Sequence, residues 1–211
     1  MKLVLNKIIR ELSFINKRRK LNNHTFTLLT NNCLGGVIYH DLHLKFNSPL
    51  INLWIYPKDF IKFCKNIDYY VTLKLEFVKM DNITYPVAKL DDIYLYFQHY
   101  ENEQDALLKW NERKKRIDKN NMYIILIEKD GCTYDDLLEF DKLPFMNKII
   151  FTHINYPMIK SAYKINGFEK EKELGDIFNY IELGKKPYDE FSIIRWLNNE
   201  DTKKRGEDMY E

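Results

Sequence analysis

Residues 28–40, LLTNNCLGGVIYH, place several chemically useful groups directly after an apolar run. Asn31 and Asn32 offer amide donors and acceptors, while Gly35 and Gly36 let backbone N–H groups approach a ligand closely. In open α/β sheets, ligands bind beyond the carboxyl ends of the strands. We therefore predict that these four residues bind substrate. An ordinary strand-to-helix turn is the alternative.

Two residues near this turn are candidates for catalysis. Cys33 would stand at a helix N-terminus, which lowers the pKa of a thiol, although a small buried residue is the more ordinary role for a free cysteine. His99 stands just after the end of the predicted strand at 93–97 and is a candidate general base. The sequence does not place either residue beside the other.

A second group of binding candidates follows His99. Trp110 and Arg113 stand one helical turn apart, so an aromatic wall and a guanidinium can face one pocket. With Tyr100 and Arg116, they would suit an anionic group attached to a ring, such as a nucleotide sugar. The alternative is a packed tryptophan beside a solvated basic helix end.

The acidic residues do not predict a metal site. Asp91, Asp92 and Asp130 fall on predicted loops, where a magnesium ion needs only one or two carboxylates plus phosphate oxygens. Asp130-Gly131 is also an ordinary turn, which we favour. His153 follows the run KIIFT, and we favour a packed strand end over catalysis. We predict no metal ligand, and any cofactor is left unassigned.

The composition of the chain limits the classes of protein to which it can belong. The 211 residues include 33 basic and 31 acidic residues, so the formal charge of +2 does not predict a nucleic-acid partner, despite the runs KRRK at 17–20 and RKKR at 113–116. The three cysteines are widely spaced without a zinc pattern, which favours a reducing compartment. The first residues lack the features of a signal peptide, and no run approaches about 20 apolar residues. We expect a cytoplasmic protein without a membrane span.

Apolar strands alternate with helices along the chain. This order predicts a layered α/β fold with a largely parallel or mixed sheet flanked by helices, Rossmann-like in arrangement. The predicted strands are 25–30, 49–55, 69–78, 87–90, 93–97, 122–127, 148–152 and 178–183. The predicted helices are 3–16, 33–44, one that begins near 56 and continues to 67, 103–118, 133–142 and 189–199.

Three stretches together resemble a bacterial family of unknown function whose members are often labelled exopolysaccharide-biosynthesis proteins. These stretches are TNNCLGGVIYHDL, YPVAKLDDIYLYFQHY and DGCTYDDLLEFDKLPFMNKIIFT. Family members have an aromatic residue after Asn-Asn-Cys, where this chain has Leu34. The family's His-Tyr and Trp–Arg–Arg-Ile segments are matched by His99, Tyr100, Trp110, Arg113, Arg116 and Ile117. The resemblance covers about residues 25–155 and implies an α/β fold and a surface-glycan context, without established catalytic residues.

We therefore treat 1–211 as one α/β domain: a helix and basic loop (1–22), a family core (23–155) and a C-terminal extension (156–211). The leading hypothesis is a transferase in surface-polysaccharide assembly that acts on an activated sugar. His99 would be its base, with Cys33 as a further catalytic candidate, and Arg113 and Arg116 would offset phosphate charge. The alternative is a non-catalytic glycan-binding or assembly partner.

Overall fold

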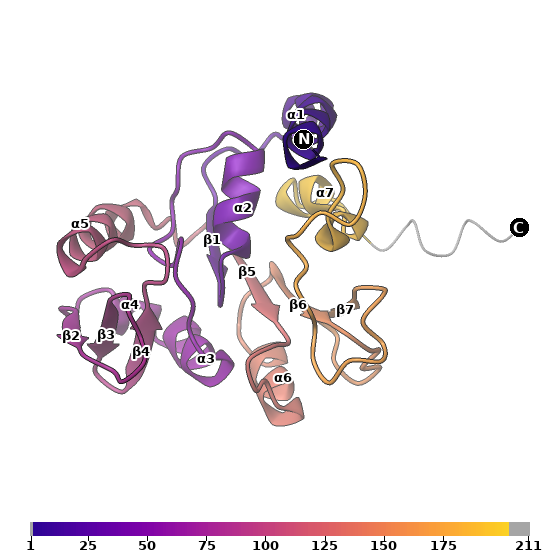
Figure 1. Ribbon diagram of the computed structural model, residues 1–211. Coiled ribbons are helices and arrows are strands. Elements are labelled where there is room, and N and C mark those ends of the chain that lie inside the picture. Colours follow the sequence, from indigo (N-terminus) through magenta and orange to yellow (C-terminus); the bar gives the residue numbers. More distant parts are fainter. Residues whose placement is uncertain (1, 203–211) are drawn as a thin grey trace, which may run out of the picture.

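The larger sheet of the protein is parallel. The computed structural model describes residues 2–202. The four strands of this larger sheet are β1 (Thr27–Thr30), β5 (Met122–Ile127), β6 (Lys148–Thr152) and β7 (Ala162–Lys164), in that spatial order (Figure 1). Every residue of β1 and β5 is buried, as expected for strands covered on both faces. The predicted α/β fold is confirmed.

Helices cover both faces of this sheet, because alternate residues of each strand point to opposite sides. On one face, Leu29 and Ile124 pack with three helices: α3 (Pro57–Lys65), α5 (Glu103–Arg113) and α6 (Tyr134–Asp141). On the other face, Leu28 and Ile125 pack with α1 (Lys2–Lys20), α2 (Leu34–Asp41) and α7 (Ile193–Leu197). The sheet thus separates two apolar cores.

A small antiparallel sheet lies beside the α3 and α5 side of the fold (Figure 1). It contains β2 (Glu76–Val78), β3 (Val87–Leu90) and β4 (Ile93–Tyr96), in that order. Trp54 extends it through an isolated bridge to Tyr96. The short helix α4 (Ile67–Tyr70) and a turn precede β2. The predicted strand over 69–78 is therefore wrong in its first half.

Most predicted elements are confirmed, among them the helices that begin near residues 103 and 133. Asn102 accepts a hydrogen bond from Asp105 N at 2.9 Å, and Thr133 forms a capping box with Asp136. The helix over 103–118 ends at Arg113 and continues as the 3₁₀ turn η1 (Lys114–Arg116). The first helix is longer than predicted and runs to Lys20, where four basic residues complement the negative end of its dipole.

Two predicted strands are wrong, and one predicted helix is shorter than predicted. Residues 49–55 form turns, with Asn52 in the left-handed region at φ 62°, and only Trp54 pairs with a strand. Residues 178–183 lead into a turn in which Glu182 bridges to Lys185. The helix over 189–199 is instead the 3₁₀ turn η2 (Pro187–Glu190) followed by the five-residue α7. Apolar content alone does not separate such packed turns from strands.

Asn31 continues the contact between β1 and β5 beyond the last paired residue. Its side-chain amide accepts a hydrogen bond from Ile127 N at 2.8 Å and donates one to Ile127 O at 3.1 Å. Its backbone oxygen accepts a bond from Ile55 N at 3.0 Å. Asn31 is fully buried, so its amide replaces water for two strand-end groups.

We expect Asn31→Ala to lower the free energy of unfolding by about 2 kcal/mol, because it leaves the buried N–H of Ile127 unpaired. The Ile127 oxygen loses one of its two hydrogen bonds and keeps the one from Lys129 N at 2.9 Å. Urea unfolding at neutral pH measures this change. The exposed Asn120→Ala is the matched control, with an expected change within about 0.5 kcal/mol. Equal stability of the two variants would contradict the role given to Asn31.

Candidate functional site

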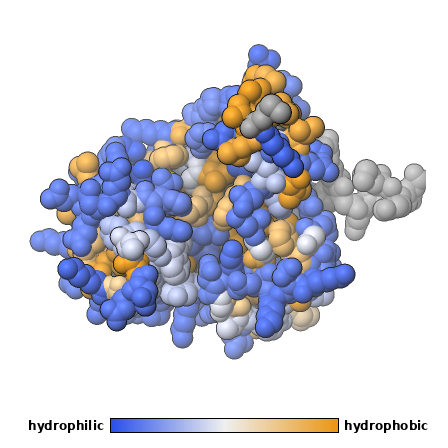
Figure 2. Space-filling model, in the orientation of Figure 1, coloured by the Kyte–Doolittle hydropathy of each residue, from blue (hydrophilic) through white to orange (hydrophobic). Residues whose placement is uncertain are grey.

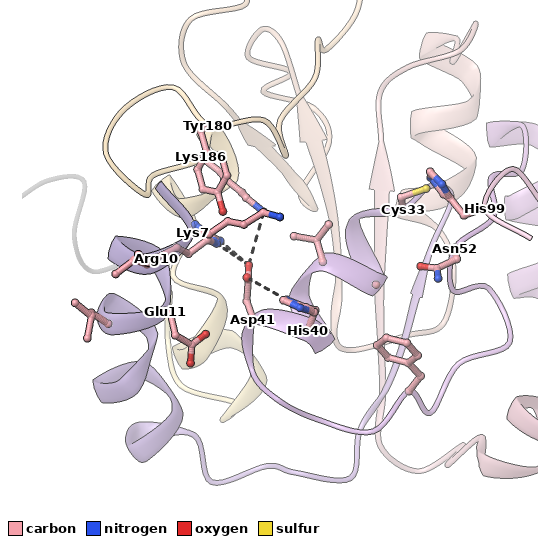
Figure 3. A pocket seen from close by; sticks show the side chains of 15 residues that line it. Lys7, Arg10, Glu11, Cys33, His40, Asp41, Asn52, His99, Tyr180 and Lys186 are labelled. Atoms are coloured by element: carbon pink, nitrogen blue, oxygen red, sulfur yellow. Dashed lines mark hydrogen bonds and ion pairs between the residues drawn. The ribbon is translucent and has the colours of Figure 1, made fainter. Parts of the chain in front are cut away.

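A cavity of about 940 Å³ opens along α2 (Figure 3). This volume is at the upper end of the range of about 300–1,000 Å³ usual for small-molecule sites. Its walls come from α1, α2, the turns before and after the small sheet, and the segment that precedes η2. The lining residues are Lys7, Ile8, Arg10, Glu11, Leu12, Cys33, Gly36, Val37, His40, Asp41, Phe46, Asn52, His99, Tyr180 and Lys186.

Helix α2 sets the length of the cavity. Cys33 caps its N-terminus and Asp41 is its last residue, so the two lie about 12 Å apart along the helix axis at 1.5 Å per residue. Figure 3 shows the two ends: Cys33, His99 and Asn52 at one, and Lys7, Arg10 and Lys186 with Asp41 at the other. The first end carries candidate catalytic groups, and the second carries cations.

Cys33 and His99, predicted independently as catalytic candidates, line the same end of the cavity. Figure 3 shows both side chains there, with Asn52 beside them. Burial, and to a lesser extent the charge of Asp176, raises the pKa of the Cys33 thiol to about 11. The thiol is therefore protonated at neutral pH, and His99 is the better candidate to accept a proton from a ligand.

Hydrogen bonds beneath the cavity hold the Asn52 turn in place. His99 N donates to Asn52 O at 3.4 Å, and Tyr100 Oη donates to Ile51 O at 2.6 Å. Arg113 Nη1 donates to Tyr100 Oη at 2.5 Å and to Ile51 O at 3.3 Å. Tyr100 and Arg113 thus use their polar atoms to position the turn and do not line the cavity itself.

The two glycines allow α2 to pack tightly against its surroundings. A Cβ at Gly35 would lie 2.8 Å from Thr30 Oγ1, and a Cβ at Gly36 would lie 2.9 Å from Asn52 Oδ1. Thr30 Oγ1 already accepts the Gly35 N–H at 3.2 Å, so that amide has a partner within the protein. Gly36 lines the cavity, whereas Gly35 lies beneath it.

Lys186 presents an ammonium group to the other end of the cavity. Its side chain is 10% exposed, and Nζ lies 4.0 Å from Asp41 Oδ2, beyond hydrogen-bond length. The Tyr180 ring centroid is 5.2 Å from Nζ. Burial lowers the pKa of Lys186, while the negative charge of Asp41 partly opposes that effect. Because this ion pair with Asp41 is long, the Lys186 ammonium can bind a ligand anion in addition.

A network around Arg10 holds this cationic end together. The guanidinium donates to Asp41 Oδ2 at 2.7 and 2.8 Å, to Asp189 Oδ2 at 2.8 Å and to Gly184 O at 2.9 Å. Tyr188 Oη donates to Asp41 Oδ2 at 2.7 Å. Burial would raise the pKa of Asp41, but its hydrogen bonds and ion pair with Arg10 hold that pKa below its usual value. Arg10 consequently has a structural role, whereas the ammonium of Lys186 remains able to bind a ligand anion.

Four other predicted binding residues are placed away from the cavity. Asn31 bridges two strands, and Asn32 Oδ1 accepts the Leu34 N–H at 3.0 Å as α2 begins. Trp110 is buried in the core, and Arg116 donates to Phe46 O at 3.0 Å and pairs with Glu112. Their substrate-binding roles stay predictions, and the geometry gives each of them a structural contact.

A second polar cluster joins the ends of β5 and β6. His153 Nδ1 lies 2.6 Å from Glu128 Oε2, which also accepts the His153 N–H at 2.9 Å, and Tyr156 donates to Glu128 Oε1. Both Glu128 and His153 are buried, and neither lines the cavity. Within residues 2–202, no group of three or more His, Cys, Asp or Glu side chains is arranged to hold a metal ion.

The sequence analysis did not identify Lys186, Asn52 or Lys7. Lys186 belongs to a turn that the sequence presents as part of an ordinary charged stretch. Asn52 stands inside an apolar run that predicts a strand. For α1, the helical spacing of the sequence could have indicated which side faces the protein. It places Arg10 on the side of the helix opposite the apolar residues Ile8 and Leu12.

We expect the pH midpoint for alkylation of Cys33 by iodoacetamide to lie near pH 11, because burial disfavours the thiolate. Peptide mapping by mass spectrometry follows the modification of Cys33 alone. A peptide of residues 28–40 serves as the control, with a midpoint near the usual value of about 8.5. A midpoint in the protein below that of the peptide would instead indicate an activated thiol.

We expect Asp41→Asn to lower the free energy of unfolding by about 3 kcal/mol at pH 7, because it removes a buried partner of Arg10. The native pKa of Asp41 is lowered, so its contribution is present above about pH 4 and declines as the pH falls further. Urea unfolding at pH 7 and pH 3 should therefore show a smaller difference at pH 3. The exposed Asp81→Asn is the control, and a difference that is unchanged between the two pH values would contradict this account.

Comparison with known proteins gives the family. Residues 4–198 match a family described as a domain of unknown function (DUF1919). A protein of Haemophilus influenzae named "Uncharacterized protein" is 47% identical over 193 residues, which cover 90% of this chain and 93% of that protein. The match includes most of α1 and the segment that carries Lys186, and so extends beyond the 25–155 resemblance. The chain belongs to the DUF1919 family.

Proposed function

We propose that this protein is a transferase that acts on a phosphate-bearing activated sugar, such as a nucleotide sugar. One observation carries the proposal: a single cavity joins the buried ammonium of Lys186 at one end to His99, Asn52 and Cys33 at the other. The surface-polysaccharide context rests on the sequence resemblance alone.

The chemistry of the two ends supports this substrate class. A phosphate at the Lys186 end would gain an ion pair with a desolvated cation, which is stronger than the same pair in water. Lys7 stands at the rim of that end and adds a second positive charge. At the other end of the cavity, the amide of Asn52 can hydrogen-bond a sugar hydroxyl. His99 can accept the proton of the acceptor hydroxyl as its oxygen bonds to the sugar carbon and the bond from that carbon to the phosphate oxygen breaks, so that the phosphate leaves toward Lys186.

The binding step is tested by a thermal-shift screen with nucleotide sugars, free nucleotides and polyol phosphates, with and without magnesium. A ligand at 100 times its dissociation constant stabilises the native state by about 2.7 kcal/mol. We expect a selective shift that Lys186→Met abolishes. Lys185→Met is the matched control, because that neighbouring side chain is 71% exposed and does not line the cavity. Equal shifts in both variants would contradict phosphate binding at Lys186.

The transfer step is tested with the stabilising donor and a panel of sugar acceptors. We expect His99→Gln to lower kcat by about 10²–10⁴-fold while the donor still raises the melting temperature, because a general base acts in the transition state and not in donor binding. Product analysis by mass spectrometry follows the reaction. Full transfer activity in His99→Gln would remove His99 from the mechanism.

A non-catalytic glycan-binding role is the second candidate, and a cluster of rings on the small sheet favours it. The Trp54 and Tyr96 rings stack at 3.9 Å, and Tyr56 packs edge-on against both while it is 44% exposed. Exposed aromatic faces bind sugar rings through apolar contact. Saturable oligosaccharide binding that Tyr56→Ala removes, without product formation from any donor, would favour this candidate over the transferase.

A further inference from the structure

Helix α1 has its apolar side turned away from the protein. Asn6, Arg10 and Phe14 are its buried residues. The outward side carries five large apolar side chains that are between 39% and 61% exposed, namely Val4, Leu5, Ile8, Leu12 and Ile15. Figure 2 shows apolar surface gathered over α1. A surface helix ordinarily has the opposite arrangement, with its apolar stripe toward the core.

The five side chains form one continuous stripe, which we call the α1 stripe. Their spacings of three, four and seven residues place them on one face of a helix. Leu5, Leu12 and Arg19 follow one another at intervals of seven, so the stripe ends at a cation.

A turn that packs against α1 also carries exposed apolar side chains. Ile181 and Leu183 are 62% and 58% exposed. The turn is fixed on α1, because Gly184 N donates to Asn6 Oδ1 at 3.2 Å and Arg10 donates to Gly184 O at 2.9 Å. The turn therefore holds two further exposed apolar side chains near α1, and the α1 stripe itself is an unusually apolar surface for a protein without a partner.

The charges around the α1 stripe identify the chemistry of that partner. Helix α1 contains seven basic residues and one acidic residue, Glu11, which pairs with Arg18. Six of the seven basic side chains lie outside the core, since only Arg10 is buried. Such a surface attracts an anionic partner, whereas a second α1 would bring like charges together.

We propose that α1 docks the protein on the surface of an anionic lipid bilayer, where it lies in the plane of the interface. A helix with an apolar stripe and flanking lysine and arginine residues binds such membranes by burying the stripe at the headgroup boundary. Within residues 2–202, no helix is long and apolar enough to cross a bilayer, so the contact is interfacial.

This docking would bring the cavity to the membrane. Ile8 and Leu12 belong to the α1 stripe and also line the cavity, as does Lys7. The mouth of the cavity would then face the headgroups. The inference rests on the surface of α1 and holds whether the cavity catalyses transfer or only binds a ligand.

The test is flotation of the full chain with vesicles of phosphatidylglycerol and phosphatidylcholine, compared with phosphatidylcholine alone. We expect binding to the anionic vesicles that weakens as salt is added. The variant Val4→Gln/Leu5→Gln/Ile15→Gln should lower the partition coefficient at least tenfold. These three side chains are exposed and do not line the cavity, so the fold and the cavity are retained.

The control variant is Leu107→Gln/Leu108→Gln, which changes two exposed apolar residues of α5. It should bind vesicles as the unaltered protein does. Equal binding of both variants, or no binding of the unaltered protein to anionic vesicles, would overturn the proposal. Light scattering after gel filtration measures the oligomeric state of both proteins. If the unaltered protein is a dimer that does not bind vesicles, and the α1 variant is a monomer, the α1 stripe instead binds a second copy of the chain.

Discussion

The buried guanidinium of Arg10 is the interaction on which the cationic half of the cavity depends. It connects α1 to the C-terminal end of α2 through Asp41, and to the segment before α7 through Gly184 and Asp189. Each of these segments contributes to the cavity wall. A charge buried this deeply is tolerated only when its hydrogen bonds are satisfied, so the requirements of Arg10 fix the relative positions of the three segments.

The same constraint accounts for the form of α1. Because its inward side must carry Arg10 and Asn6, the helix cannot use that side for an apolar contact alone, and Phe14 is its only buried apolar residue. The apolar residues on the outward side then remain available for another surface. The ion pair that builds the cavity wall thus also leaves the α1 stripe exposed beside the mouth of the cavity.

The parallel sheet and its main helices could be predicted from the sequence because their signals are local. The apolar run at 122–127 forms β5, and the helices predicted to begin near 103 and 133 begin there, after the capping residues Asn102 and Thr133. The turns at 49–55 and 178–183 were missed because packing against distant segments, and not local preference, gives them their apolar character. For example, Tyr100 and Arg113 hold the oxygen of Ile51, which lies 49 and 62 residues away. The cavity was predictable only in part: Cys33, Gly36 and His99 line it, whereas Lys186 reaches it through contacts of α1 with the C-terminal region.

The network of Arg10 also has a consequence for the order in which the chain folds during its synthesis. Its partners Gly184 and Asp189 lie 174 and 179 residues further along the sequence. Contacts of such large sequence separation form late, because the intervening chain must first be ordered. During synthesis from the N-terminus, the sheet and the Cys33 end of the cavity can assemble while the cationic wall is still unmade. The cavity wall that carries Lys186 is therefore completed only after nearly the whole family region, residues 4–198, has been translated.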